Sequence, residues 1–177
     1  DVTKLTIGLN TTIDKVYSLN FIDTPERKSF AFFGAFNYQL VKNKIITSQS
    51  VRKEFVQGLD NPLSGSFGIE YKILENISIM GSTSKNYRLP TFNDLYYSNL
   101  GNPDLKAEEG YGSEVSTKIM NKIGWVKLTG FYNDYENWIN WQPQDNGLWQ
   151  PQNNNVETKG LEFLTQLNYK KFFFRGN

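Results

Sequence analysis

The stretch LSGSFGIEYKI, Leu63 to Ile73, alternates strictly between two sets of positions. One set carries Leu, Gly, Phe, Ile, Tyr and Ile, whereas the positions between them carry Ser, Ser, Gly, Glu and Lys. Successive side chains of a β-strand point to opposite faces of the sheet, so a period of two predicts a strand with one apolar and one polar face. The stretch therefore indicates an all-β fold class.

Three further windows repeat the alternation less strictly, at residues 5–19, 30–40 and 161–169. The first window, fifteen residues long, would span about 50 Å as a strand. Strands of soluble proteins usually have about five or six residues, whereas a tilted strand needs about 9–11 to cross a membrane. Long alternating strands favour an antiparallel transmembrane β-barrel over a soluble sandwich. We expect one face to contact lipid, through Leu5, Ile7, Leu9, Phe67, Ile69 and Tyr71.

Short and long connections between the predicted strands alternate along the chain. Short connections are expected at Val41–Lys44, Lys72–Asn76, Met120–Ile123 and Lys170–Lys171, and long ones at Ile22–Arg27, Gln57–Pro62, Tyr87–Ala107 and Asn137–Asn155. Outer-membrane barrels have tight periplasmic turns and longer outer loops, so we expect the long connections outside the cell.

The predicted strands cover residues 3–20, 28–40, 45–56, 63–72, 76–86, 108–119, 123–136 and 156–169, and a last one begins at Phe172. Since single-chain bacterial barrels have even strand numbers, about nine strands would be part of a larger barrel.

The composition fits a membrane barrel and weighs against enzymes. Aromatic residues reach 15% (10 Tyr, 13 Phe and 4 Trp), although only 38% of residues are hydrophobic; barrels of this kind combine aromatic girdles with a polar interior. Cys and His are absent, which removes thiolate catalysis and the commonest general base and metal ligand. We therefore predict no enzymatic activity, no catalytic residues, no metal and no cofactor. The net charge of +1 gives no reason to expect nucleic acid.

The segment SKNYRLPTFNDLYYSNLGNPDLKAEEGYGSEVS, Ser84 to Ser116, combines the end of a strand with a compact loop. Pro90 cannot donate to a β-ladder, so the strand should end there. Thr91 could cap one helical turn, and Gly101-Asn102-Pro103 is a turn signal. We expect Arg88 to tie the loop to a carboxylate such as Asp94 or Glu108.

The same segment resembles a stretch that recurs in TonB-dependent outer-membrane receptors. There, an aromatic or small residue ends a strand and is followed by Arg, any residue, Pro and Thr; then come Leu-Tyr, Gly-Asn-Pro, Leu and an acidic pair. The matching residues are Tyr87, Arg88, Pro90, Thr91, Leu95, Tyr96, Gly101, Asn102, Pro103, Leu105, Glu108 and Glu109. The resemblance is close over this segment and extends loosely, through strand spacing, along the chain.

The resemblance implies that residues 1–177 are the C-terminal part of the barrel domain of such a receptor, without its plug domain. Receptors of this family have barrels of roughly 22 strands. The implied function is TonB-energised uptake of a scarce, bulky solute through the bacterial outer membrane, with a vitamin B12-type or siderophore-type ligand favoured. The implied partners are outer-membrane lipid, TonB through the plug, and a corrinoid, siderophore or glycan.

Candidate ligand contacts lie in ENWINWQPQDNGLWQPQNNN, Glu136 to Asn155. Tryptophans among amides suit large neutral or amphipathic solutes, although a place in the interfacial aromatic girdle would also explain them. We expect ligand contacts from Trp138, Trp141, Trp149, Asn146 and Tyr96, and loop shaping from Tyr87, Arg88, Pro90, Gly101, Asn102 and Pro103.

Two other interpretations remain open from the residues alone. A soluble all-β carbohydrate-binding module could use Trp138, Trp141 and Trp149. A β-rich glycosidase could use a pair of carboxylates. Dependence on detergent for solubility would separate a barrel fragment from either.

Overall fold

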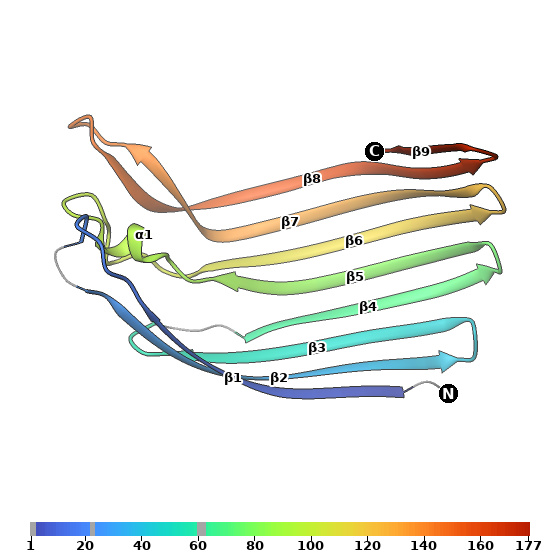
Figure 1. Ribbon diagram of the computed structural model, residues 1–177, viewed down its shortest axis with the longest axis horizontal. Coiled ribbons are helices and arrows are strands. Elements are labelled where there is room, and N and C mark those ends of the chain that lie inside the picture. The colour runs from blue at the N-terminus through green and yellow to red at the C-terminus, as the bar shows by residue number, and fades with distance from the viewer. Residues whose placement is uncertain (1–2, 22–23, 60–62) are drawn as a thin grey trace.

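A computed structural model describes residues 3–21, 24–59 and 63–177, which form one antiparallel sheet of nine strands in chain order (Figure 1). The elements are β1 (Thr3–Lys15), β2 (Glu26–Val41), β3 (Ile45–Val56), β4 (Leu63–Leu74), β5 (Ile77–Arg88), α1 (Phe92–Tyr96), β6 (Glu108–Asn121), β7 (Gly124–Pro143), β8 (Trp149–Tyr169) and β9 (Phe172–Gly176). Each strand pairs with the next one along the chain, as expected for a stretch of barrel wall.

One face of the sheet is apolar and exposed. Directly opposed residues of antiparallel strands share a face, and a single row of opposed residues joins Leu5, Phe36, Gln49 and Phe67 across β1 to β4. The six residues expected on the lipid side all lie on this face. Their exposed fractions run from 39% for Ile69 to 74% for Ile7. The predicted shared face is confirmed; we call it the apolar face.

The opposite face, the polar face, is lined mainly by small and hydrophilic side chains. Ser50 and Ser66, which are directly opposed, share a hydrogen bond of 2.7 Å. Aromatic rings on this face lie flat over glycines of the neighbouring strand: a Cβ at Gly8 would come within 2.3 Å of the Phe33 ring. Gly110 under Tyr135 and Gly160 under Phe131 repeat the arrangement. Glycine is needed at these positions because the rings occupy the space of a side chain.

The turns gather at one end of the sheet and the longer connections, with α1, at the other (Figure 1). We call the second end the loop end. Parts of two expected long connections, residues 22–23 and 60–62, lie outside the described residues. No helix in the described ranges has the length and apolar character needed to cross a membrane.

Five strands, β2 to β6, begin and end within two residues of the predicted bounds, and the start of β9 agrees as well. The predicted end of β1 at residue 20 is wrong, because its pairing stops at Lys15 opposite Glu26. Pro25 precedes that pair, and proline cannot donate a ladder hydrogen bond.

The expected loop Asn137–Asn155 is also wrong. β7 continues to Pro143 and β8 starts at Trp149, so residues 144–148 alone connect the two strands. The register shifts between Tyr135 and Trp138, and Asn137 there has a φ of 56°. This bulge lets the ladder continue through a segment whose Asn, Gln and Pro content had indicated a loop.

Candidate functional site

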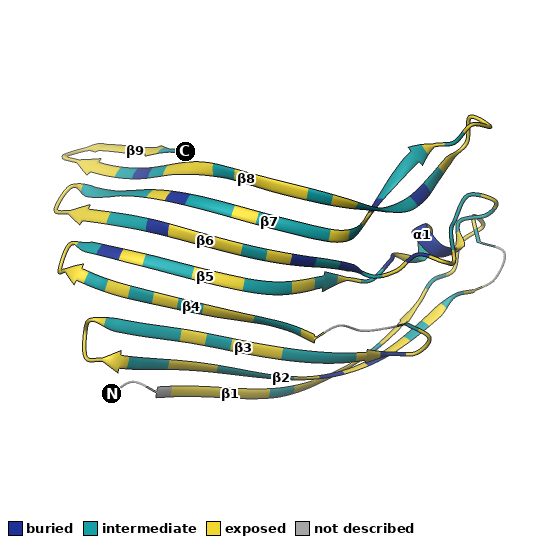
Figure 2. Ribbon diagram, turned by 180° about the vertical axis from the view of Figure 1, so that it is seen from behind, coloured by how far each residue is buried: buried dark blue, intermediate teal, exposed yellow. Residues whose placement is uncertain are grey.

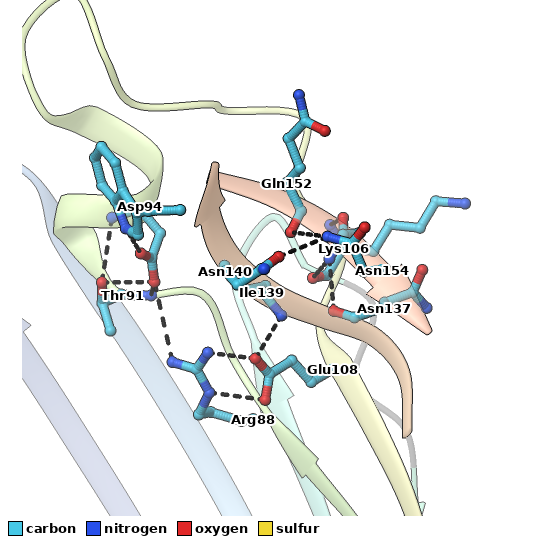
Figure 3. Close-up of polar contacts among 12 residues, drawn as sticks. Arg88, Thr91, Asp94, Lys106, Glu108, Asn137, Ile139, Asn140, Gln152 and Asn154 are labelled. Atoms are coloured by element: carbon cyan, nitrogen blue, oxygen red, sulfur yellow. Dashed lines mark hydrogen bonds and ion pairs between the residues drawn. The ribbon is translucent and has the colours of Figure 1, made fainter. Parts of the chain in front are cut away.

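Arg88, the last residue of β5, binds two carboxylates at the loop end (Figure 3). Its Nε donates to Glu108 Oε2 at 2.8 Å, and its Nη2 donates to the other oxygen of the same carboxylate. Its Nη1 lies 4.0 Å from Asp94 Oδ2. Glu108 lies directly opposite in β6 and its side chain is 7% exposed, so the bidentate fork holds a carboxylate that is largely shielded from water. Both predicted partners of Arg88 are confirmed.

Asp94 joins three segments through one carboxylate. Its Oδ2 accepts hydrogen bonds from the backbone N–H of Thr91 at 2.9 Å and from the Thr91 hydroxyl at 2.7 Å. The backbone N–H of Asp94 donates in return to Thr91 Oγ1 at 3.2 Å, which completes a capping box on α1. Its Oδ1 accepts a hydrogen bond from Trp141 Nε1 at 3.0 Å. A capping box satisfies N–H groups that a short helix leaves without partners. The expected cap at Thr91 is confirmed, and the same carboxylate also fixes β7.

A small apolar core lies beneath these polar contacts. Leu95, Leu105 and Ile139 are each at most 7% exposed and form one cluster, and buried residues gather around α1 and the start of β6 (Figure 2). Ile139 also donates its backbone N–H to Glu108 Oε1 at 2.7 Å. The loop after β5 and the far part of β7 therefore form one packed unit.

The remaining loop-shaping residues also make specific contacts. Gly101 is needed for close approach, since a Cβ would lie 2.7 Å from the backbone of Leu95. Asn102 Nδ2 donates to the carbonyl oxygen of Pro151 at 3.2 Å. The Tyr87 hydroxyl donates to the Glu54 carboxylate. Pro90 is fully buried.

The far part of the β7–β8 hairpin has two unlike faces. Ile139 and Trp141 share one face with their opposed residues Asn153 and Pro151, and this face packs on the loop that carries α1. Trp141 contacts Tyr97 edge to face, with centroids 6.3 Å apart. Trp141 is therefore part of the packed unit rather than an open surface.

The opposite face of the hairpin carries a row of side-chain amides. These are Asn140, Gln142, Gln144, Gln150, Gln152 and Asn154, which we call the amide face; all six are half-buried. Asn154 Nδ2 donates to Asn140 Oδ1 at 2.6 Å (Figure 3). Gln152 Nε2 donates to Gln144 Oε1 at 3.0 Å. The sequence analysis missed this face, although amides recur there at every second position.

The other candidate contacts are not brought into one site. Trp149 is 56% exposed, and Asn146 lies at the hairpin tip, where its Oδ1 accepts from the backbone of Leu148. Trp138 is 37% exposed and packs edge to face on Tyr135. Tyr96 is 45% exposed and stacks on Phe92. The β7–β8 hairpin thus carries Trp138, Asn146 and Trp149, whereas Tyr96 lies on α1.

The chain is similar to known receptors along most of its length. Its 123-residue match with the vitamin B12 transporter BtuB of Vibrio vulnificus (strain YJ016) is 28% identical and covers 68% of this chain but 20% of that protein. The crystal structure of the siderophore receptor PirA from Pseudomonas aeruginosa has a TM-score of 0.84 at 18% identity and covers 96% of this chain and 34% of the receptor. The ferric enterobactin receptor PfeA, in complex with BCV-L6, has a TM-score of 0.80 at 18% identity over 99% and 33%.

These structural likenesses show the fold, and the chain spans about a third or less of the length of each protein named. The family model described as TonB dependent receptor-like, beta-barrel, matches residues 3–177. The chain therefore belongs to the TonB-dependent receptor β-barrel family, whose members are receptors and transporters of the bacterial outer membrane.

Proposed function

We propose that residues 1–177 form part of the barrel wall of an outer-membrane importer that takes up a vitamin B12-type or siderophore-type solute. The observation that supports this most directly is the contrast between the two ends of the sheet. One end has tight turns, whereas the loop end holds a packed unit that presents exposed aromatic and amide side chains. A rigid scaffold with side chains of this kind at an open end suits the capture of a large solute.

The proposed partners follow from the family. The energy for uptake would come from TonB acting through a plug domain, and the apolar face would contact outer-membrane lipid. We propose no enzymatic activity, since the role of such a wall is to hold and pass a solute. A soluble carbohydrate-binding module is not favoured, because it would have to expose the whole apolar face to water.

For ligand capture we propose Trp149, Trp138, Asn146 and Tyr96, together with the amide face. Flat rings supply contact area and amides supply neutral hydrogen bonds, which suits a solute rich in carboxamides or hydroxyls. For Trp141 we propose a positioning role in place of direct contact, since its N–H is engaged by Asp94. Arg88 and Pro90 shape the loop on which Tyr96 lies.

Uptake by the full-length receptor tests the proposal. The receptor would be expressed in a host that lacks its own vitamin B12 and siderophore receptors, and uptake of labelled vitamin B12 and of ferric enterobactin would be measured with and without functional TonB. We expect TonB-dependent uptake of at least one solute. Absence of uptake of both, with the receptor present and folded in the outer membrane, would contradict the proposal.

A further inference from the structure

Arg27, near the start of β2, is held at the loop end by contacts that carry no negative charge. Its Nη2 donates a hydrogen bond to the carbonyl oxygen of Pro90 at 2.6 Å. Its guanidinium carbon lies 4.9 Å from the centroid of the Phe92 ring. Phe92 is the first residue of α1, which the capping box of Thr91 and Asp94 fixes. Within the residues that the structure describes, the guanidinium is therefore positioned but not neutralised.

Arg27 belongs to the polar face of the wall. It is directly opposed to Asp14 in β1, and the next residue on its own side of β2 is the buried Ser29. Lys28, one residue further on, points to the apolar face and pairs there with Glu26 at 2.8 Å. The two adjacent cations thus lie on opposite sides of the wall.

Arg27 differs in its surroundings from two other arginines near the loop end of the polar face. Arg52 lies 3.5 Å from Glu54, and Arg88 binds Glu108. Arg27 forms no ion pair within the described ranges, and its contact with Pro90 takes it towards α1 rather than onto the Asp14 carboxylate. A guanidinium has five N–H donors in a planar fork. A half-buried guanidinium with most donors unused is suited to bind an oxyanion.

Room for a larger group lies against α1, in a cavity that Arg27 itself does not line. Tyr96, which stacks on Phe92 with ring centroids 6.2 Å apart, lines a cavity of about 370 Å³ together with Pro25 and Tyr97. Glu26 also borders the cavity, but Lys28 engages its carboxylate. A charged fork next to aromatic rings matches a solute in which an anionic group lies beside a flat or apolar part.

We propose that Arg27 is the residue that binds the anionic group of the imported solute, with the adjoining part of the solute lying against Tyr96. The inference rests on the proposed function and adds the charge of the group that is recognised. The group that Arg27 recognises is an oxyanion that accepts hydrogen bonds from the guanidinium. Its source is either the phosphodiester of a cobalamin or the deprotonated chelating oxygens of a siderophore.

The test measures the preference of the full-length receptor within two matched pairs of probes. The first pair is vitamin B12 and cobinamide, which lacks the phosphodiester. The second is ferric enterobactin, an anionic chelate, and a positively charged ferric trihydroxamate. Affinity and TonB-dependent uptake are measured for the wild type, Arg27→Gln and Arg27→Lys. Lys28→Gln is the matched control, because it removes the same charge one residue away on the opposite face.

We expect Arg27→Gln to lower the preference for the anionic member of the transported pair by about tenfold or more, and Arg27→Lys to keep part of it. Lys28→Gln should leave the preference unchanged. The pair in which the preference falls identifies the source of the anion. An unchanged preference in Arg27→Gln would overturn the inference, whether both affinities fell together or neither did, and Arg27 would then serve only to hold α1.

If Arg27→Gln fails to reach the outer membrane, the inference can still be tested with Arg27→Lys and the wild type. Binding of the anionic probe by the wild type should weaken as salt is raised, whereas binding of its partner should not. Equal salt dependence within the pair would contradict the inference. If the wild-type receptor imports none of the four probes, both the proposed function and this inference are wrong. If it imports a probe but Arg27→Gln leaves the preference unchanged, only the inference is wrong.

Discussion

Arg88 is the side chain for which we propose a role in shaping the loop end without touching a ligand. Its fork satisfies both oxygens of Glu108, and it adds a longer contact to Asp94. Truncation to alanine would leave two largely buried carboxylates with fewer partners. Because the Arg88 side chain is itself 47% exposed, water can replace part of its contribution, so the expected cost falls below the roughly 3–5 kcal/mol associated with breaking a buried pair.

We therefore predict that Arg88→Ala lowers the unfolding free energy of the full-length barrel by about 1–3 kcal/mol, while ligand affinity changes little. Thermal unfolding and ligand titration on the same purified receptor would measure both. Arg88→Lys keeps the charge but loses the fork, and it should fall between the alanine variant and the wild type. Abolished binding in an Arg88→Ala barrel as stable as the wild type would show that Arg88 contacts the solute.

At the scale of elements, the β7–β8 hairpin is the part that the sequence predicted least well. The strands β2 and β4 followed from their periodicity because one face of each must be apolar to meet lipid. Beyond Tyr135 that requirement ends, since the hairpin packs on α1 instead. Alternation of amides with Ile, Trp and Pro replaces the usual alternation of apolar and polar residues, and a loop was predicted there.

The candidate site could be predicted only in part for the same reason. The partners of Arg88 and the cap at Thr91 depend on residues that are close in sequence or directly opposed on neighbouring strands. The contact between Trp141 and Asp94 depends on how a bulge at Asn137 turns the hairpin, and no local pattern encodes that direction. Arg27 was placed at the end of a long connection, and its contact with Phe92 could not be predicted because it joins segments far apart in the chain.

Two substitutions in the hairpin can distinguish a side chain that contacts the solute from one that only positions the loop end. Trp149→Ala should weaken solute binding by roughly thirtyfold, as loss of an exposed aromatic anchor commonly does. Trp141→Phe keeps an aromatic ring but removes the N–H that Asp94 accepts and part of the indole, so it should destabilise the loop end by about 1–3 kcal/mol and change affinity less. Ligand titration and thermal unfolding of both variants provide the comparison. A larger loss of affinity in Trp141→Phe than in Trp149→Ala would assign direct contact to Trp141.

At the scale of the whole molecule, the two faces of the wall should tolerate charge very differently. Ile69 lies on the apolar face near the middle of β4, and Glu70 lies beside it on the polar face. Ile69→Arg should destabilise the barrel by roughly 2–4 kcal/mol if it lies near the midplane of the membrane. Glu70→Arg, the matched control, should cost much less, because its side chain meets the interior. Folding into lipid vesicles, followed by urea titration, measures both, and equal costs would show that the faces are misassigned.

The orientation of the wall gives the last prediction. Asn43 lies in the turn between β2 and β3, whereas Asn146 lies at the tip of the β7–β8 hairpin, and both are exposed at opposite ends of the sheet (Figure 1). Short turns face the periplasm in outer-membrane barrels, so a membrane-impermeant thiol reagent on intact cells should label Asn146→Cys and leave Asn43→Cys unlabelled.

This chain has no Cys of its own, and accessible cysteines elsewhere in the receptor would be replaced. Permeabilised cells should label both positions, which controls for the reactivity of each thiol. Labelling of Asn43→Cys alone on intact cells would invert the wall and move Trp149, the amide face and Arg27 to the periplasmic side, where none could meet a solute arriving from outside.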